Sequence, residues 1–498
     1  MLLSETLRET RGSRVYRDVP IAGVAYDSRA VKPGFLFVAI PGTQLDGRNF
    51  ITDACARGAS AIVTESDGIP EGVGPDIGFA SVPDARRALS QISNHFYGEP
   101  SRSLLVVGVT GTKGKTTTCH LVKSVLDACG EKTGLIGTVH NIVGDEERPV
   151  RRTTPESTDL AALMREMVDA GSTAVTMEVS SHALSLMRVE DIAFDGAIIT
   201  NIGRDHLDFH GTMENYVAAK RHLFELLCPS GAKGRGGPVA AVNLDDPYAG
   251  RFLGISGGRE VTYGLTPDAE ISARDLSMDP ARTSFTLVFP TTSERVSMPL
   301  PGRFNVCNAL AAASVAYGLG KSPQSIALGL SRAPKVKGRV EVVQGPGNYS
   351  VWVDYAHTPE SLRDVLALAR EMAVGKVIAV FGCGGDRDRG KRPVMGRISG
   401  DMADFTIITD DNPRTENEDF ILDQIEEGIL QSRGSRAYLR VKDRRQAIRE
   451  AVMRACDGDI VVLAGKGHET YQEFADRAIH FDDAEEALAA MRERASRP

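Results

Sequence analysis

A glycine-rich stretch that ends in Lys115 and Thr116 carries the clearest chemical signal in this chain of 498 residues. The apolar run 104–107 precedes it and a helical pattern of apolar residues follows it, which predicts a strand, a tight loop and a helix. In that setting Gly111 and Gly114 let backbone amides approach phosphate oxygens, and Lys115 can reach the terminal phosphates of a nucleotide. The Thr116 hydroxyl is a suitable ligand for Mg²⁺. The stretch therefore predicts a nucleotide-binding loop.

The loop departs by one residue from the spacing G-x-x-x-x-G-K-[ST] that such loops usually follow. Val109 occupies the position of the first glycine, and Gly108 directly precedes it. The alternative is a glycine-rich turn with a solvated lysine and no ligand. Because Gly-Lys-Thr here follows a short apolar strand and begins a helix, we favour nucleotide binding.

Two residues further along the chain are candidate ligands for the metal ion that accompanies a bound nucleotide. Glu178 ends an apolar strand, and Mg²⁺ usually takes only one or two carboxylates from a protein. A capping or ion-pair role is the alternative for this carboxylate. His206 lies in the polar segment 205–210 and could be a metal ligand, an acid-base group or an ordinary loop histidine; the segment by itself favours the last.

Lys220 interrupts an apolar stripe on a predicted helix over residues 213–227. The stripe is formed at helical spacing by Met213, Val217, Phe224 and Leu227. An unpaired ammonium group is costly to bury, so a buried lysine here should be paired, deprotonated or chemically modified. The alternative is a lysine at the edge of the stripe whose head reaches solvent, and the spacing alone favours it.

Composition limits the classes of function. The net charge of −8 argues against a nucleic-acid partner, which normally leaves a basic footprint. The chain does not begin with a basic segment followed by an apolar core, and no uncharged apolar run is long enough to cross a bilayer. The seven cysteines are scattered without a C-x-x-C pair, which disfavours a disulfide framework or a zinc site. We therefore expect a cytoplasmic protein without membrane insertion. A monomer is a separate expectation that composition does not decide.

The length suggests three domains, which the elements around these residues support. Residues 1–101 are expected to form a small N-terminal α/β domain. Its expected strands are 21–25, 34–39 and 59–64. Polar clusters at 27–29 and 41–48 follow two of these strands, and each taken alone is better explained as a turn than as a binding site.

Residues 102–333 are expected to form a central P-loop ATPase-like domain with a mostly parallel sheet, because strands and helices alternate. Its expected strands beyond the loop are 134–138, 174–179, 194–200 and 239–244. Ligands of such sheets gather beyond the carboxyl ends of the strands. Glu178 and the segment 201–206 both fall at such ends.

Residues 334–498 repeat the alternation, and we expect a C-terminal Rossmann-like domain, which completes a three-domain α/β protein. Its expected strands are 351–353, 377–381, 405–409 and 460–463. These strands end in polar or glycine-rich loops at 354–357, 382–387, 410–414 and 465–469. Four such loops in one domain predict a second ligand site.

The chain resembles the Mur ligases, a family that adds amino acids to the peptide of the bacterial cell-wall precursor. The matching motifs span almost the whole length: DSR at 27–29, DGR at 46–48, TGTKGKTT at 110–117, TTPE at 153–156, EVSSH at 178–182, TNIGRDHLD at 200–208, AK at 219–220, PGRFNVCN at 301–308, DYAHTP at 354–359 and DNPR at 411–414. The family's own phosphate loop has the same one-residue offset, so the departure at Val109 supports the resemblance.

The resemblance implies a ligase that uses ATP and Mg²⁺, and it implies roles for individual residues. Uridine-nucleotide contacts would come from Tyr26, Ser28, Thr43 and Gln44, and contacts to the sugar and peptide from Thr153, Thr154, Ser181 and Arg188. ATP contacts would come from Gly111, Thr112, Lys113, Gly114, Lys115, Thr116, Thr117, Asn308, Arg339 and Asp354. The magnesium shell would comprise Thr116, Glu178, His206 and a carbamylated Lys220, and the last three with Lys115 would be the catalytic residues. Carbamylation would turn the misplaced lysine into an anion.

The amino acid to be added can be argued from charge. Meso-diaminopimelate carries a second carboxylate that lysine lacks, and a guanidinium group can bind a carboxylate through two hydrogen bonds. Arg414 matches the diaminopimelate-adding members of the family, and its alternative role is a surface turn residue. The other amino-acid contacts implied by the resemblance are Arg387, Asp411, Asn412, Pro413, Gly465 and Glu469.

The resemblance further implies that ATP phosphorylates the D-glutamate side chain of UDP-N-acetylmuramoyl-L-alanyl-D-glutamate and that the diaminopimelate amine attacks the acyl phosphate. Closure of the C-terminal domain would align the two reacting groups. The alternatives are a lysine-adding ligase and a folylpolyglutamate-type ligase, which would need neither the uridine-binding domain nor Arg414. A P-loop nucleotide switch is a third alternative, although the chain contains no N-K-x-D sequence for reading guanine.

Overall fold

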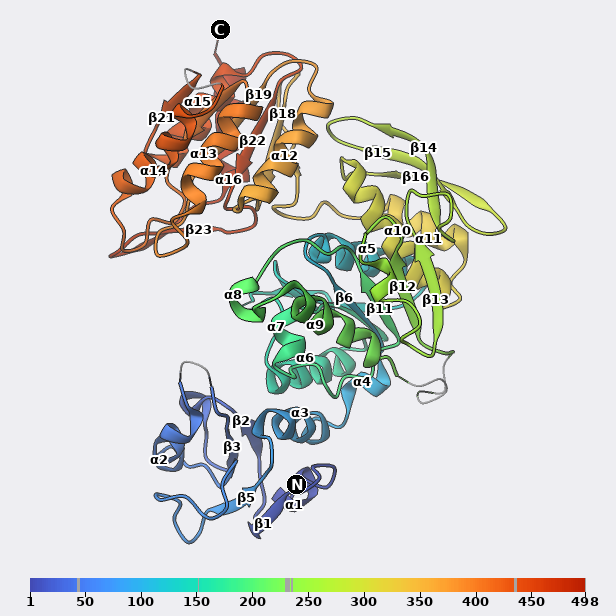
Figure 1. Cartoon of the computed structure of the whole chain (residues 1–498), viewed down its shortest axis with the longest axis vertical. Helices are drawn as coiled ribbons and strands as arrows, with labels where there is room; N and C mark the ends of the chain where they lie inside the picture. The colour runs from blue at the N-terminus through green and yellow to red at the C-terminus, as the bar shows by residue number, and fades with distance from the viewer. Residues whose placement is uncertain (43–44, 151, 229–232, 234–235, 434–436, 498) are drawn as a thin grey trace. The chain divides into compact units, whose positions relative to one another are not determined.

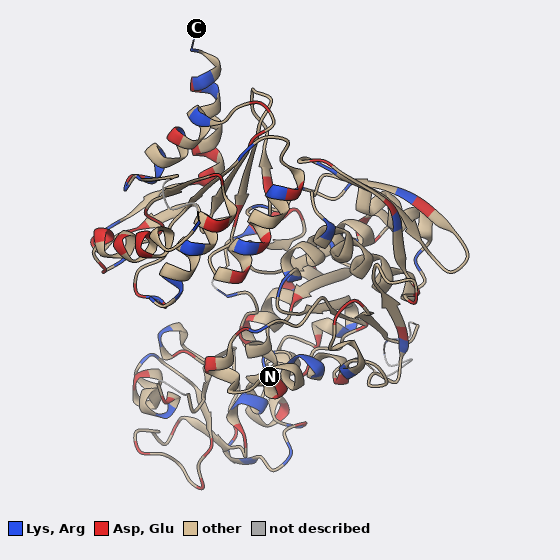
Figure 2. Ribbon diagram, turned by 45° about the horizontal axis from the view of Figure 1, so that its top comes forward, with Lys and Arg blue, Asp and Glu red and all other residues tan. Residues whose placement is uncertain are grey.

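The computed structural model describes the chain except for residues 43–44, 151, 229–232, 234–235, 434–436 and 498. Contacts divide the chain into two compact units. The first comprises Met1–Arg274, Leu287–Glu294 and Cys307–Leu330, and the second comprises Asp275–Thr286, Arg295–Val306 and Ser331–Pro498. Helices pack on mostly parallel sheets in both units, which confirms the predicted α/β class (Figure 1). Basic and acidic residues are interspersed along the ribbon in the view of Figure 2.

The N-terminal part of the first unit contains a five-stranded sheet in the order β1-β5-β4-β3-β2. Its strands are β1 (Arg14–Arg17), β2 (Gly23–Ala25), β3 (Phe35–Ala39), β4 (Ala61–Thr64) and β5 (Gly78–Ser81). β1 is antiparallel to β5, and the other pairs are parallel. The helices of this part are α1 (Leu3–Thr6), α2 (Ile51–Ala56) and α3 (Ala85–Phe96). The apolar pattern predicts β2, β3 and β4 but misses β1 and β5, because neither contains a long apolar run.

The rest of the first unit is organised around an eight-stranded sheet in the order β13-β12-β11-β6-β10-β7-β8-β9. Its strands are β6 (Leu105–Thr110), β7 (Thr133–Ile136), β8 (Asn141–Val143), β9 (Glu146–Arg148), β10 (Ala174–Glu178), β11 (Gly196–Ile199), β12 (Val239–Asn243) and β13 (Arg259–Tyr263). Neighbouring strands from β13 to β7 are parallel, whereas β8 and β9 form an antiparallel edge. β6, β10 and β12 are buried throughout, which explains their nearly continuous apolar sequences.

Helices accompany this sheet, and those from α5 to α9 lie in the chain between its parallel strands β6 and β12. They are α4 (Pro100–Ser103), α5 (Lys115–Ala128), α6 (Ser157–Asp169), α7 (Ser181–Ser185), α8 (Leu207–His210), α9 (Met213–Glu225), α10 (Arg303–Gly318) and α11 (Pro323–Ser331). Three unpredicted strands, β14 (Ser272–Met278), β15 (Thr283–Val288) and β16 (Ser293–Met298), form a separate sheet. Because β6 lies between β10 and β11, the residues that follow these three parallel strands meet at one edge of the main sheet.

The C-terminal part of the second unit has a six-stranded sheet in the order β17-β18-β22-β19-β20-β21. Its strands are β17 (Glu341–Val343), β18 (Ser350–Asp354), β19 (Val377–Phe381), β20 (Phe405–Ile408), β21 (Tyr438–Arg440) and β22 (Ile460–Ala464), and β23 (Tyr471–Glu473) pairs with β24 (Ala478–His480). From β18 to β21 the strands are parallel, as predicted, and β17 is antiparallel. The unpredicted strands β17, β21, β23 and β24 are three residues long.

Two hydrophobic cores lie on the two faces of this sheet. One contains residues of α12 (Pro359–Met372), α13 (Lys391–Met402) and α14 (Glu418–Leu430), and the other contains residues of α15 (Arg444–Arg454) and α16 (Asp483–Ala495). The C-terminal part is therefore a three-layer α/β/α arrangement. Among the described residues, no helix has the length and apolar character needed to cross a membrane.

Candidate functional site

The predicted phosphate loop lies between β6 and α5 and depends on two glycines. Gly111 has φ +144° and Gly114 has φ +85°, which L side chains rarely adopt. A Cβ atom on Gly111 would lie 1.8 Å from Thr200 Oγ1, and one on Gly114 would lie 2.5 Å from Asn308 Oδ1. The loop therefore requires glycine both for its backbone angles and for the close approach of its neighbours.

The end of β11 fixes the phosphate loop from the side. Thr112 N donates to Asn201 O at 2.8 Å, and Lys113 N donates to Asn201 Oδ1 at 3.0 Å. Thr200 Oγ1 and Asn201 Nδ2 both donate to Lys113 O, at 2.6 and 3.0 Å. The sequence contained the segment 200–208 but no signal that these two side chains brace the loop, since the contacts arise from sheet order.

Glu178 lies beside the phosphate loop, as expected, and is 1% exposed. Its Oε2 accepts from Thr116 Oγ1 at 3.0 Å. Thr138, just beyond β7, donates to the same carboxylate through its backbone N at 2.7 Å and its Oγ1 at 3.0 Å. The hydroxyl and the carboxylate predicted to bind Mg²⁺ are thus adjacent, and Thr138 is a partner that the sequence did not reveal.

Lys220 on α9 is 1% exposed, so its head does not reach solvent and the edge-of-stripe interpretation is wrong. Its Nζ donates to Gly111 O at 2.8 Å and lies 4.5 Å from the centre of the Tyr216 ring. Burial, with the nearby charge of Lys115, moves the pKa of Lys220 well below its usual range. The predicted catalytic lysine therefore lies at the phosphate loop, in a setting that disfavours its charged form.

His206 precedes α8 with a left-handed backbone, φ 52°. Its ring lies 4.7 Å from the ring of His182, centre to centre. Burial is the main cause that lowers the pKa of His206; the charges of Lys115 and Lys220 lower it further. Across the described part of the chain, no group of three or more His, Cys, Asp or Glu side chains is placed to hold a metal ion.

The residues expected to contact the sugar and peptide gather around the end of β10. Thr154 Oγ1 donates to Glu178 O at 2.8 Å, and Arg188 Nη1 donates to Thr154 O at 3.2 Å. Thr153 Oγ1 lies 3.1 Å from Thr138 Oγ1, within hydrogen-bond distance. Ser181 Oγ lies 3.0 Å from His210 Nε2 at the start of α7. The structure thus brings the four expected residues, Thr153, Thr154, Ser181 and Arg188, to the same edge of the sheet as the phosphate loop.

The expected uridine contacts are only partly described. Tyr26 donates its hydroxyl to Asp159 Oδ2 on α6 at 2.8 Å. Burial, followed by this hydrogen bond, raises the pKa of Tyr26 above its usual range. Ser28 is buried at the start of a short 3-10 helix, Ser28–Ala30. Thr43 and Gln44 lie outside the described residues.

The remaining expected ATP contacts are divided between the two units. Asn308 belongs to the first unit, where its Oδ1 accepts from Thr118 Oγ1 at 3.2 Å. Arg339 and Asp354 belong to the second, where Asp354 Oδ2 accepts from the backbone N of Val340 at 2.8 Å. The Arg339 guanidinium carbon lies 5.2 Å from the centre of the Tyr355 ring.

The expected amino-acid contacts form one network at the carboxyl ends of β20 and β22. Arg414 donates through Nε to Glu473 Oε2 at 3.0 Å and through Nη1 to Gly385 O at 2.8 Å. Asn412 Nδ2 donates to Glu469 Oε2 at 2.8 Å. The fully buried Lys466, which the sequence did not single out, donates to Asn412 Oδ1 at 3.1 Å.

Four further members of that set adjoin this network: Arg387, Asp411, Pro413 and Gly465. Gly465 has φ +114°, and a Cβ atom there would lie 2.6 Å from Asp411 Oδ2. A Cβ atom on Gly385 would lie 1.8 Å from Pro413 O. Arg387 donates through Nη1 to Asp386 O at 3.3 Å on the neighbouring loop.

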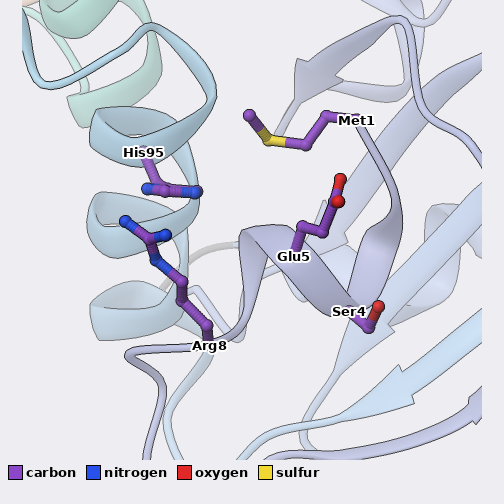
Figure 3. Close-up of a pocket in the computed structure, with 5 residues that line it drawn as sticks. All are labelled: Met1, Ser4, Glu5, Arg8 and His95. Atoms are coloured by element: carbon purple, nitrogen blue, oxygen red, sulfur yellow. The ribbon is translucent and has the colours of Figure 1, made fainter.

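A cavity of about 440 Å³ lies apart from all of these residues. It is lined by Met1, Ser4, Glu5, Arg8 and His95, which lie on the N-terminal segment and α3 (Figure 3). None of its lining residues is a predicted site residue.

A glycine-dependent phosphate loop on a parallel sheet, with a buried carboxylate beside its threonine, defines a P-loop nucleotide-binding protein. Three family models match the chain: the Mur ligase family catalytic domain at residues 20–97, the Mur ligase middle domain at 109–316, and the Mur ligase, glutamate ligase domain at 338–467. The chain belongs to the Mur ligase family. These matches confirm the predicted order of N-terminal, central and C-terminal domains.

Individual relatives match over almost the whole length. UDP-N-acetylmuramoyl-L-alanyl-D-glutamate--2,6-diaminopimelate ligase of Caldanaerobacter subterraneus subsp. tengcongensis is 42% identical over 484 residues, which cover 97% of each chain. The protein of the same name from Solibacter usitatus is 44% identical, covering 93% of this chain and 92% of its own. A solved structure of a ligase of that name has a TM-score of 0.69 at 33% identity and covers 96% of each chain.

Proposed function

We propose that this protein is an ATP-dependent ligase that joins meso-diaminopimelate to UDP-N-acetylmuramoyl-L-alanyl-D-glutamate during synthesis of the peptidoglycan precursor. Relatives with this activity in their names match at 42–44% identity over 93% or more of the chain. The observation that carries the choice of amino acid is Arg414, which two contacts hold at a strand-end loop beside Asn412 and Glu469. A guanidinium group there suits the carboxylate that distinguishes diaminopimelate from lysine.

In the proposed reaction, the D-glutamate carboxylate attacks the terminal phosphoryl group of ATP to give an acyl phosphate and ADP. The diaminopimelate amine then displaces phosphate and forms the amide. Lys115 would move from Gly111 O and Thr112 O, which its Nζ contacts at 2.8 and 2.9 Å, to neutralise the transferred phosphoryl group. Thr153, Thr154, Ser181 and Arg188 would orient the sugar and peptide so that the carboxylate faces the phosphate loop.

The residues present fit a magnesium ion. Thr116 Oγ1 and Glu178 Oε2 lie 3.0 Å apart at the phosphate loop, and Mg²⁺ prefers oxygen ligands of these kinds. His206 and a carbamylated Lys220 would complete its surroundings, directly or through water. When bound, the ion would neutralise charge on the ATP phosphates.

Carbamylation of Lys220 is supported by its environment. Carbon dioxide reacts with a neutral amine, and burial favours the neutral form of this lysine. The product would be an anion with Lys115 as a nearby cation, because both lysines contact Gly111 O. It would thus replace a buried, uncompensated ammonium group by a paired charge.

The proposal retains domain boundaries at 1–101 for UDP-substrate binding, 102–333 for ATP binding and 334–498 for amino-acid binding. A cytoplasmic location is consistent with the use of ATP and a nucleotide-linked substrate. The remaining expected contacts, Tyr26 and Ser28 to uridine and Asn308, Arg339 and Asp354 to ATP, belong to the same proposal.

The test is phosphate release from ATP, measured with the UDP-muramoyl dipeptide and either meso-diaminopimelate or lysine. We expect release that depends on both the dipeptide and diaminopimelate. Release without the dipeptide would refute the ligase proposal, and equal rates with lysine would refute the choice of amino acid. ATP turnover with no small-molecule acceptor would favour a nucleotide switch.

A further inference from the structure

The two arginines expected at the amino-acid site lie on different loops of the second unit. Arg387 follows β19 and Arg414 follows β20, and these strands are parallel neighbours. A Cβ atom on Gly384 would lie 3.0 Å from Arg414 Nη1 and 3.7 Å from Arg387 Cγ, so both side chains border the same short piece of backbone. Recognition of one carboxylate by such a pair requires that the two loops keep a fixed spacing.

The side chain of Glu416 links the loop after β20 to the loop after β19. Glu416 follows Arg414 by two residues, its side chain is 8% exposed, and its Oε1 accepts from Asp386 N at 2.6 Å. In return, the Asp386 carboxylate accepts from Thr415 N at 3.2 Å and from Thr415 Oγ1 at 2.8 Å. A third hydrogen bond between the loops runs from Gly385 N to Asn412 O, at 2.8 Å.

Arg392, near the start of α13, holds Glu416 in place. Its side chain is 0% exposed, and its guanidinium group donates to both oxygens of the Glu416 carboxylate. Nη1 donates to Oε2 at 3.1 Å and Nη2 donates to Oε1 at 2.9 Å. The same guanidinium donates to Gly384 O at 3.2 Å and to Gln424 Oε1 on α14 at 2.8 Å. The hydrogen bonds from Arg392 are the main cause that lowers the pKa of Glu416 to about 2.

We propose that Arg392 is a positioning residue for recognition of the amino-acid carboxylate: through Glu416 and Gly384 it sets the spacing between the loops that carry Arg387 and Arg414. This inference rests on the proposed function, because it assumes that those two arginines bind the substrate carboxylate. A lysine could not replace Arg392, since an ammonium group is a point charge and cannot reach both carboxylate oxygens, Gly384 O and Gln424 in one plane.

The test compares the wild-type ligase with Arg392→Lys in the phosphate-release assay. We expect the KM for meso-diaminopimelate to rise at least tenfold and the preference for diaminopimelate over lysine to fall by a similar factor. The KM values for ATP and for the UDP-muramoyl dipeptide should stay within twofold. A general loss of stability would not produce this split, so an unchanged KM for diaminopimelate in a folded Arg392→Lys protein overturns the inference.

Two further variants keep the test decisive. Ile448→Ala empties part of the core on the opposite face of the sheet and should lower the melting temperature without changing the KM for diaminopimelate. Glu416→Gln keeps an oxygen that can accept from Asp386 N but removes the charge that Arg392 binds, so it should raise that KM about threefold. If Arg392→Lys does not fold, an unchanged KM in a folded Glu416→Gln protein overturns the inference. A wild-type protein inactive with diaminopimelate refutes the proposed function itself, which is a different result from a defect confined to the variants.

Discussion

The ammonium groups of Lys115 and Lys220 both donate to the carbonyl oxygen of Gly111, each at 2.8 Å. Two cations that share one acceptor repel each other, and the Lys220 head is also shielded from water. The pKa of Lys220 is therefore well below its usual range, with burial as the larger cause. The phosphate loop and the lysine of α9 thus form one electrostatic unit, in which conversion of Lys220 to an anion would relieve the repulsion.

Removal of the Lys220 side chain should abolish most of the activity and create a site that a small acid can fill. We expect Lys220→Ala to lose on the order of 100-fold in kcat, the usual effect of deleting one charge-stabilising group. Acetate or another short carboxylate should restore part of this loss, because it supplies the missing anion. The measurement is phosphate release against carboxylate concentration. Lys220→Arg serves as the control, since its filled site should show no rescue, and absence of rescue in Lys220→Ala would count against the carbamate.

Local spacing predicted the phosphate loop, whereas the residues that brace it could not be predicted. Gly111 and Lys115 act within a few residues of one another, so their pattern is visible in the sequence. Thr138 and Asn201 reach the site only because β7 and β11 flank its strands, and strand order is not encoded in local pattern. The role of Arg392 was not predicted, because a charged residue near the start of a helix is normally exposed, whereas this one is buried.

The strands likewise divide into those that local hydrophobicity predicts and those that depend on pairing with distant residues. The buried strand β19 was predicted with its observed bounds, because every residue in it is apolar. β14, in contrast, consists of half-buried and exposed residues and contains the exposed Arg274 and Asp275. Its position depends on pairing with β15 rather than on hydrophobicity.

Glu178→Gln should weaken the use of magnesium more than it weakens folding. The amide keeps an oxygen that can accept from Thr138 N, but it removes the negative charge beside Thr116. We expect the Mg²⁺ concentration for half-maximal activity to rise about 10-fold to 100-fold. The measurement is phosphate release over a magnesium titration at saturating ATP. Glu190→Gln is the matched control, because Glu190 is a part-buried carboxylate of the same unit that pairs with His222; an equal change in both variants would contradict the assignment.

Arg414→Lys should change the choice of amino acid. A lysine keeps the charge but cannot hold Gly385 O and Glu473 while also presenting donors to a substrate carboxylate. We expect kcat/KM for diaminopimelate to fall about 30-fold to 100-fold, equivalent to about 2–3 kcal/mol for a charged hydrogen-bonding group. The value for lysine should change less than threefold. Arg477→Lys, between β23 and β24, where Arg477 pairs with Asp476 at the surface, should leave both values unchanged. Equal losses for the two amino acids would show that Arg414 supports the fold rather than the specificity.

His222 should make the stability of the first unit depend on pH. Its Nε2 lies 2.8 Å from Glu190 Oε2 and its Nδ1 lies 3.0 Å from Glu225 Oε2, and the hydrogen bond with Glu190 is the main cause that raises its pKa to about 9. A raised pKa means that the stabilisation is complete below the ordinary value of about 6.5 and is lost as the pH rises through about 9. His222→Gln should therefore lower the melting temperature by a few degrees at pH 6, about 1 kcal/mol after allowance for solvent screening, and by much less at pH 10. His480→Gln is the control, because His480 and Glu485 are exposed and their pair should contribute little at either pH. The measurement is the melting temperature at pH 6 and at pH 10. An equal decrease for His222→Gln at both pH values would show that the charged pair does not cause the loss of stability.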